Sequence, residues 1–189
     1  MTIQHNLITG SDLHEPKGVA AAGANQVYVA NGSGSGAWST VASGSLNTPR
    51  GKFYFYNLGS PYTLSYGGAT QKVAPTTVAS GLNNLVTEAT SARLTYTGTP
   101  TVVLKVDFDV AVSQASGSDK KLTIAVHKNG SVLSGSEIYL TSVTSDIHTG
   151  SGSCLVSAAT NDYFEVFAFN TDGSGDMVFN KVGLTLTQA

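Results

Sequence analysis

Apolar and polar residues alternate along most of the chain after Gly51, a period that is typical of β-strands. The longest example runs from Val102 to Val112, where apolar residues occupy every second position and mainly polar residues lie between them. Such a strand buries one face and exposes the other. The expected buried face consists of Val102, Leu104, Val106, Phe108, Val110 and Val112.

Shorter runs with the same period follow, separated by turns rich in Gly and Asn. No helical period longer than two turns appears in the sequence. Several short strands at this spacing predict an all-β domain, a β-sandwich or jelly roll. The further strands are expected over residues 122–127, around Ile138 and Leu140, around Cys154 and Val156, and over residues 163–169 and 177–186.

The first 48 residues have a different pattern, because they contain too few apolar residues to form a core. Residues 26–30 and 37–39 alternate like strands on either side of an Asn-Gly pair, which predicts a small hairpin. An isolated hairpin is marginally stable in water, so its aromatic residues Tyr28 and Trp38 are expected to contact a partner surface or sister chains. We therefore divide the chain into an extended N-terminal docking arm with a Gly/Ser linker, residues 1–48, and a β-domain, residues 49–189.

Two strands carry large apolar side chains on both faces. In the first, Phe53 and Phe55 alternate with two tyrosines, and a similar alternation recurs after Asn161. A sandwich covers one face of each strand, so apolar residues on the second face indicate contact with another chain. A cyclic homo-oligomer is the simplest arrangement. The residues expected in its interface are Tyr54, Tyr56, Tyr163, Phe167 and Phe169.

Charge and hydropathy narrow the possible partners. Only 12% of the residues are charged and the formal net charge is −2, so most of the surface polarity comes from Ser, Thr, Asn and Gly. No stripe of Lys and Arg is present, which argues against nucleic-acid binding. No apolar run reaches the ~20 residues that a membrane-spanning helix needs, and the first residues lack the pattern of a signal peptide. We expect a protein made in the cytoplasm that does not insert into membranes.

The candidates for catalysis are few. Asp107 and Asp109 lie on one face of the long strand, about 7 Å apart by the rise of a strand. That spacing suits a glycosidase carboxylate pair or a metal, but the neighbouring Lys105 and Ser113 favour a solvated face. No serine nucleophile elbow and no Cys/His arrangement appears. We predict a protein that is not an enzyme, has no catalytic residues and needs no cofactor.

Metal binding is weakly suggested in two places. Residues 170–176 carry oxygen ligands at alternate positions, but Lys181 stands where a calcium loop needs its last carboxylate, which favours a turn between strands. His5 and His14 in the arm are spaced unlike a metal site, although around an oligomer axis they would be able to hold an ion. No metal is assigned. The single cysteine, Cys154, is expected to be a small buried hydrophobic residue.

Three segments of the β-domain carry a family resemblance. Residues 122–131 resemble the strand and turn of complement-globular-head and tumour-necrosis-factor-like jelly rolls. Residues 161–170 look like the Gly-Asp-Tyr strand of these domains, with Asn161 in place of the usual Gly, and Leu184-Thr185-Leu186 resembles their closing strand. The resemblance covers roughly residues 50–189. It implies an antiparallel jelly-roll β-sandwich, here preceded by the extended arm, that assembles as a homotrimer.

The arm has a resemblance of its own. Residues 12–18, 27–30 and 34–38 look like an N-terminal segment of virion structural proteins from tailed phages. This implies a homotrimeric capsid decoration (cement) or head-fibre protein on the capsid surface, whose partners are itself and the major capsid protein. The arm would dock on the shell and the jelly roll would project from it. The residues expected to dock are Asp12, Leu13, His14, Glu15, Pro16, Lys17, Tyr28 and Trp38.

A second function stays open. A trimeric tail fibre or tail tip protein would share the fold and the trimer, and would bind a host surface glycan instead. Its candidate binding loops, residues 113–119 and 171–176, are small and polar and contain no aromatic residue. Saccharide sites usually combine apolar or aromatic contacts with hydrogen-bonding groups, so the sequence favours decoration over glycan binding.

Overall fold

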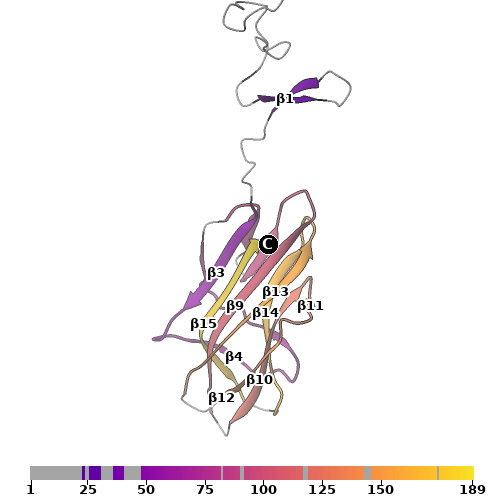
Figure 1. The fold of residues 1–189 in the computed structure, drawn as a ribbon. Helices are drawn as coiled ribbons and strands as arrows, with labels where there is room; N and C mark the ends of the chain where they lie inside the picture. Colours follow the sequence, from indigo (N-terminus) through magenta and orange to yellow (C-terminus); the bar gives the residue numbers. More distant parts are fainter. Residues whose placement is uncertain are drawn as a thin grey trace, which may run out of the picture. The chain divides into compact units, whose positions relative to one another are not determined.

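The computed structural model describes residues 23, 26–30, 36–40, 48–81, 83–89, 92–116, 119–142, 146–173 and 175–189. The chain divides into two compact units, Met1–Asn47 and Thr48–Ala189. Among the described residues every regular element is a β-strand (Figure 1). The prediction of an all-β domain is therefore confirmed.

The second unit contains two antiparallel sheets. In the first sheet the long strand β9 lies between β13 and β15, and β15 also pairs with β3, so the chain termini of the domain share this sheet. We call it the β9 sheet. Its strands, in order across the sheet, are β13 (His148–Ala158), β9 (Val102–Gln114), β15 (Met177–Gln188), β3 (Arg50–Tyr56) and β6 (Ala79–Ser80), with β4 (Tyr62–Leu64) pairing β15.

The other sheet is built around the antiparallel pair of β10 and β14, in which Leu122 lies opposite Asn170 and Lys128 opposite Phe164. We call it the β14 sheet. Its strands, in order, are β11 (Ser131–Val132), β10 (Lys120–Lys128), β14 (Tyr163–Asn170), β8 (Arg93–Tyr96) and β7 (Val86–Ala89), with β12 (Ile138–Ser142) pairing β10 and β5 (Gln71–Lys72) pairing β14.

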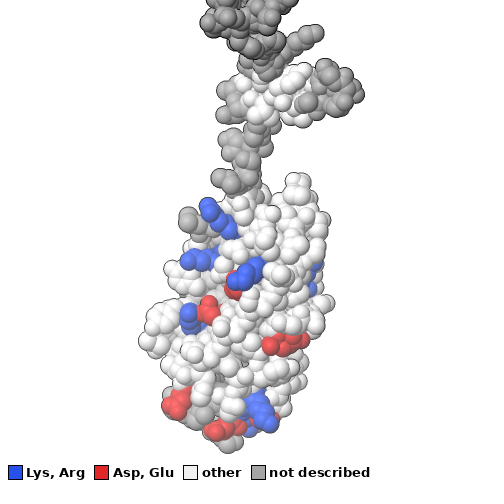
Figure 2. All heavy atoms as spheres, in the orientation of Figure 1, with Lys and Arg blue, Asp and Glu red and all other residues white. Residues whose placement is uncertain are grey.

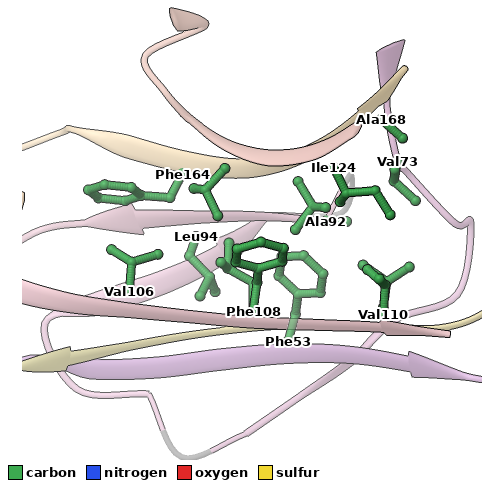
Figure 3. Packing of buried hydrophobic residues seen from close by; sticks show 14 of the residues in the cluster. Phe53, Val73, Ala92, Leu94, Val106, Phe108, Val110, Ile124, Phe164 and Ala168 are labelled. Atoms are coloured by element: carbon green, nitrogen blue, oxygen red, sulfur yellow. The ribbon is translucent and has the colours of Figure 1, made fainter. Parts of the chain in front are cut away.

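The core lies between the two sheets. Phe53, Phe108 and Val110 of the β9 sheet point toward Ile124 and Phe164 of the β14 sheet (Figure 3). Every second residue of β9 from Leu104 to Val112 is buried, as the alternation predicted, and Val102 packs against the same core. Burying apolar side chains from facing strands is the main source of stability in such a sandwich. The expected strands after residue 120 are also present.

Two parts of the sandwich have no apolar alternation in the sequence. Strands β5 to β8 are only two to four residues long. Strand β13 begins at His148, well before Cys154. The sequence does not reveal this start, because the inward positions Gly150 and Gly152 carry no side chain. A Cβ on Gly150 would lie 2.7 Å from Ile138 Cδ1, and one on Gly152 would collide with the ring of Phe108. The glycines therefore leave room for neighbouring side chains to fill the core.

The first unit contains the predicted hairpin. Strands β1 (Gln26–Ala30) and β2 (Gly36–Thr40) pair antiparallel, with Tyr28 opposite Trp38 and their rings edge to face at 5.5 Å. The strands of the hairpin are therefore confirmed. The arm residues 1–22, the turn 31–35 and the linker 41–47 lie outside the described residues.

Candidate functional site

The predicted docking residues fall into two groups. Residues 12–17 lie outside the described residues, so their role stays a prediction. Tyr28 and Trp38 share one face of the hairpin, whereas Val27 and Val29 on its other face are each about half exposed, at 48% and 49%. The hairpin thus carries apolar side chains on both faces, and in the described part of the chain β1 and β2 have no further strand partner.

The five residues predicted for the oligomer interface lie on two different sheets. Tyr54 and Tyr56 are on the outer face of β3, in the β9 sheet. Tyr163, Phe167 and Phe169 are on the outer face of β14, in the β14 sheet. The outer faces of a sandwich point in opposite directions, so the structure does not bring these five side chains together on one surface.

On the β14 sheet the aromatic residues already have partners within the chain. The Arg93 guanidinium lies 3.9 Å from the ring centre of Tyr163, and the His127 ring stacks on Phe167 at 3.9 Å with an interplanar angle of 16°. Between these pairs the buried Glu165 carboxylate accepts hydrogen bonds from Lys72 Nζ at 2.5 Å and Arg93 Nε at 2.8 Å. These contacts hold the outer face of β14 in place within a single chain.

A hollow lies beside the stacked pair, on the outer face of β10 and β14. It has a volume of about 320 Å³. One of its lining residues is the small Ala125, which lies directly opposite Phe167 in the strand pairing. The sequence indicated that Phe167 and Phe169 face outward. It did not indicate that a hollow lies between them and residues of β10, β11 and two loops. The residues that line it are Thr70, Thr123, Ala125, His127, Val132, Glu137, Phe167 and Phe169.

The outer face of the β9 sheet combines exposed apolar side chains with paired charges. Tyr54 is 44% and Tyr56 62% exposed on β3, and Leu155 on β13 is 65% exposed. Between them Lys181 Nζ lies 2.6 Å from Asp109 Oδ2, and Lys105 Nζ lies 3.0 Å from Asp107 Oδ1. In the view of Figure 2 basic and acidic side chains are interspersed and most of the surface is uncharged.

These ion pairs bear on the enzyme alternative. Asp107 and Asp109 each have a lysine partner on a sheet face, and they do not face each other across a cleft. A carboxylate pair that shares a catalytic task has to flank the same bond of a substrate. The geometry therefore favours the solvated-face interpretation of these residues. That the protein is not an enzyme remains a prediction.

The metal candidates are resolved only in part. Within the described ranges, no group of three or more His, Cys, Asp or Glu side chains is placed to hold a metal ion. In the turn after β14, Asp172 accepts a hydrogen bond from the Lys121 backbone N–H at 2.9 Å, and Asp176 accepts one from the Tyr66 N–H at 2.9 Å. Their carboxylates thus bind backbone, as in a turn between strands. His5 and His14 lie outside the described residues.

The cysteine behaves as a packing residue. Cys154 is half-buried and packs against the core. Burial raises the pKa of its thiol, and the nearby charges of Asp107 and Glu137 raise it further. A raised pKa means less thiolate at neutral pH and therefore lower reactivity. Among all the residues that the structure describes, no helix has the length and apolarity that a bilayer crossing requires.

Comparisons with known proteins bear on the fold of the second unit. No protein-family model matches the sequence, and no curated protein matches it. Among solved structures, Eiger TNF from S. frugiperda is 10% identical, with 75% of this chain and 93% of that chain covered and a TM-score of 0.50. PRD1 vertex protein P5 is 13% identical, with 75% of this chain and 96% of that chain covered and a TM-score of 0.49. The globular domain of zebrafish complement 1qA protein is 16% identical, with 75% of this chain and 96% of that chain covered and a TM-score of 0.44. The likeness to Eiger TNF confirms the predicted fold class, a jelly-roll β-sandwich.

Proposed function

We propose that this chain is a non-enzymatic virion structural protein, a homotrimeric capsid decoration or head-fibre protein that docks on a phage shell through its N-terminal arm. The observation that carries the proposal is the hairpin unit. Residues 18–49 contain no charged side chain, and the hairpin has apolar side chains on both faces. A hairpin with two apolar faces is marginal in water by itself, so it needs a partner surface.

The trimer is best built through the β9 sheet. A closed ring of three chains joins two different surface patches of neighbouring protomers, and patches that point in opposite directions generate an open stack instead. Tyr163 and Phe167 are stacked with Arg93 and His127 of the same chain, respectively, each at 3.9 Å. Tyr54 and Tyr56 are 44% and 62% exposed, and the Lys52 ammonium lies farther from the Tyr54 ring centre, at 5.6 Å. We therefore restrict the proposed interface to the outer face of the β9 sheet around Tyr54 and Tyr56.

Trimerisation would strengthen docking without any new contact. Three copies of the arm on one trimer bind with a high effective concentration once the first is attached, so weak contacts add up. In this scheme residues 12–17 supply polar and apolar contacts to the major capsid protein, and Tyr28 and Trp38 supply aromatic anchors. The capsid surface is then the location of the assembled protein.

The direct test is deletion of residues 1–18. The truncated chain is expected to fold and to form the same oligomer as the full chain, and to lose binding to particles that lack the protein. A matched control replaces residues 12–17 with Gly and Ser at unchanged length, and it should lose binding as well. Full binding by both variants would contradict the assignment of docking to this segment.

A tail fibre or tail tip protein is the second candidate. The hollow beside Phe167 and Phe169 favours it, because aromatic side chains there adjoin hydrogen-bonding groups. The loops considered first, residues 113–119 and 171–176, lack aromatic residues. In this function the arm would attach to the tail and the hollow would contact host glycans. Binding of the truncated chain to host cells, competed by a soluble saccharide, would favour it.

A further inference from the structure

The hollow on the outer face of the β14 sheet arises from one small residue among larger ones. Ile124 and Val126 point into the core, so Ala125 between them points outward. Its side chain ends at Cβ, while its strand neighbours Thr123 and His127 and its cross-strand partner Phe167 all extend further. Ala125 is itself only 5% exposed, and the hollow that it lines with these neighbours measures about 320 Å³. That volume is at the lower end of the roughly 300–1,000 Å³ of ligand pockets, which suits a ligand of one ring.

The floor and walls of the hollow are apolar and come from separate strands. Phe167 and Phe169 are contributed by β14, and Val132 by β11. The stack with His127 holds Phe167 in its orientation. Aromatic and aliphatic walls favour a ligand with an apolar face of its own, because that face leaves water on binding.

The polar groups in the wall are mainly acceptors. His127 Nδ1 lies 3.2 Å from the Gly130 carbonyl oxygen, which can only accept, so Nδ1 carries the proton and Nε2 is an acceptor in the neutral ring. Glu137 Oε2 accepts the Gly135 backbone N–H at 2.8 Å, which orients the carboxylate and leaves Oε1 for a further donor. The hydroxyls of Thr70 and Thr123 both donate and accept.

The charge of the lining excludes some ligands. Among the described residues that line the hollow there is no Lys or Arg, and Glu137 adds a negative charge. Phosphates and acidic sugars are therefore repelled. A quaternary ammonium has no N–H or O–H group, so it would leave His127 Nε2 and the threonine hydroxyls without a hydrogen-bond partner. A ligand with hydroxyl donors, an apolar ring face and no charge matches the lining best.

We propose that this hollow binds one pyranose ring of a neutral saccharide. The C–H face of the sugar lies on Phe167 and Phe169, and its hydroxyls donate to Glu137 and His127 and bond the threonine hydroxyls. The site is complete within one chain and depends neither on the arm nor on the interface around Tyr54 and Tyr56. Because its side chains are already held by intrachain contacts, little ordering is needed on binding.

The test uses the full chain and titration by ligand-observed NMR and calorimetry. The probes are methyl glycosides of glucose, galactose and mannose and N-acetylglucosamine, with sialic acid and choline as charged comparisons. At least one neutral probe is expected to bind saturably, and the charged probes are expected to bind more weakly. No binding of any neutral probe, or tighter binding of choline or sialic acid, would overturn the proposal.

Variants locate the site. Ala125→Leu fills the hollow and is expected to lower affinity at least tenfold, and Glu137→Gln is expected to lower it severalfold. Thr123→Val removes one hydroxyl at almost constant size, so it tests the site even where Ala125→Leu unfolds. The matched control is Thr95→Leu on β8, which lies on the same sheet outside the lining.

Two outcomes of the variants would contradict the proposal. Unchanged affinity in Ala125→Leu and Thr123→Val would place the bound sugar elsewhere on the chain. Dissociation of the oligomer by Ala125→Leu, with Thr95→Leu unaffected, would show that this face is an interface between copies. Since binding is measured on the isolated protein, a negative result leaves docking through the arm to be judged by its own test.

Discussion

Glu165 is a buried carboxylate held between two cations on the outer face of β14. Its side chain is 4% exposed, with Lys72 Nζ and Arg93 Nε both bound to Oε1. Glu165→Gln removes the charge and leaves the two cations without their counter-ion. We expect the free energy of unfolding to fall by about 1–3 kcal/mol, as for the loss of a hydrogen bond to a charged group. Urea unfolding of the variant measures this loss.

The control for this prediction is an ion pair on the other sheet. Asp107 and Lys105 form a bridge in which both side chains are substantially exposed. Asp107→Asn is therefore expected to lower the free energy of unfolding by less than about 1 kcal/mol. Equal losses in the two variants would show that burial does not strengthen the Glu165 pairs.

Asp162 ties two turns together and makes stability depend on acid pH. Burial alone would raise the pKa of its carboxyl, but hydrogen bonds from the Lys128 and Asn129 side chains and the Ala159 backbone N–H, with the Lys128 charge, hold it below the ordinary value. Because the pKa is lower in the folded state, the ionised carboxylate stabilises the fold at a pH above its ordinary pKa of 3.8. This stabilisation is lost as the pH falls through the lower pKa of the folded state.

The pH prediction is tested with Asp162→Asn. The chain with Asp162 is expected to be more stable than the variant at pH 7, and the difference should shrink as the pH is lowered below about 4. Urea unfolding at several pH values measures both free energies. A difference that stays constant or grows on acidification would mean that the Asp162 carboxylate has no preferred interactions in the folded state.

At the scale of single elements, the glycines of β13 determine how the two sheets meet. Gly152 leaves no space for a Cβ, because the ring of Phe108 occupies that position. Gly152→Ala should therefore displace Phe108 and lower the free energy of unfolding by about 1–3 kcal/mol. Ser153→Ala, one residue along the same strand and facing outward, is the control and should change little. A thermal melt that ranks the two variants in the reverse order would contradict this packing.

The strands differ in how clearly the sequence predicts them. Strand β9 is recognisable because its buried positions are all large apolar residues, and β3 because Phe53 and Phe55 alternate with tyrosines. Strand β13 is recognisable only from Cys154 onward, since the glycines at its inward positions 150 and 152 erase the alternation. Strands β5 to β8 are too short for a period to appear. The sequence misses β13 before Cys154 and the short strands β5 to β8 because pairing with strands distant in the chain, and not a local pattern, makes these segments extended.

The candidate sites show the same limit. Alternation predicted which aromatic residues face outward, and the burial of Phe164 and Val166 confirms it for β14. It did not predict that the outward residues lie on opposite sheets, because the sheet assignment depends on pairing across the whole domain. Nor did it predict the hollow, which joins Ala125 to residues from β11, β14 and two loops.

At the scale of the whole molecule, self-association tests the proposed interface. Replacing Tyr54 and Tyr56 together by Ser removes the exposed aromatic surface of β3. We expect the full chain to sediment as a trimer and the double variant to shift toward the monomer. Tyr139→Ser is the control, because Tyr139 is 78% exposed but lies on the other sheet. Dissociation caused by Tyr139→Ser and not by the double variant would move the interface to the β14 sheet.

The central proposal, a virion structural protein attached to the head, is tested most directly by counting the chain in purified particles. Quantitative mass spectrometry gives its copy number relative to the major shell protein. A ratio near one, or a simple fraction of it, is the predicted result, since decoration distributes trimers over the shell. A handful of trimers per particle would favour the tail fibre or tail tip instead. Absence of the chain from purified particles would contradict a virion role altogether.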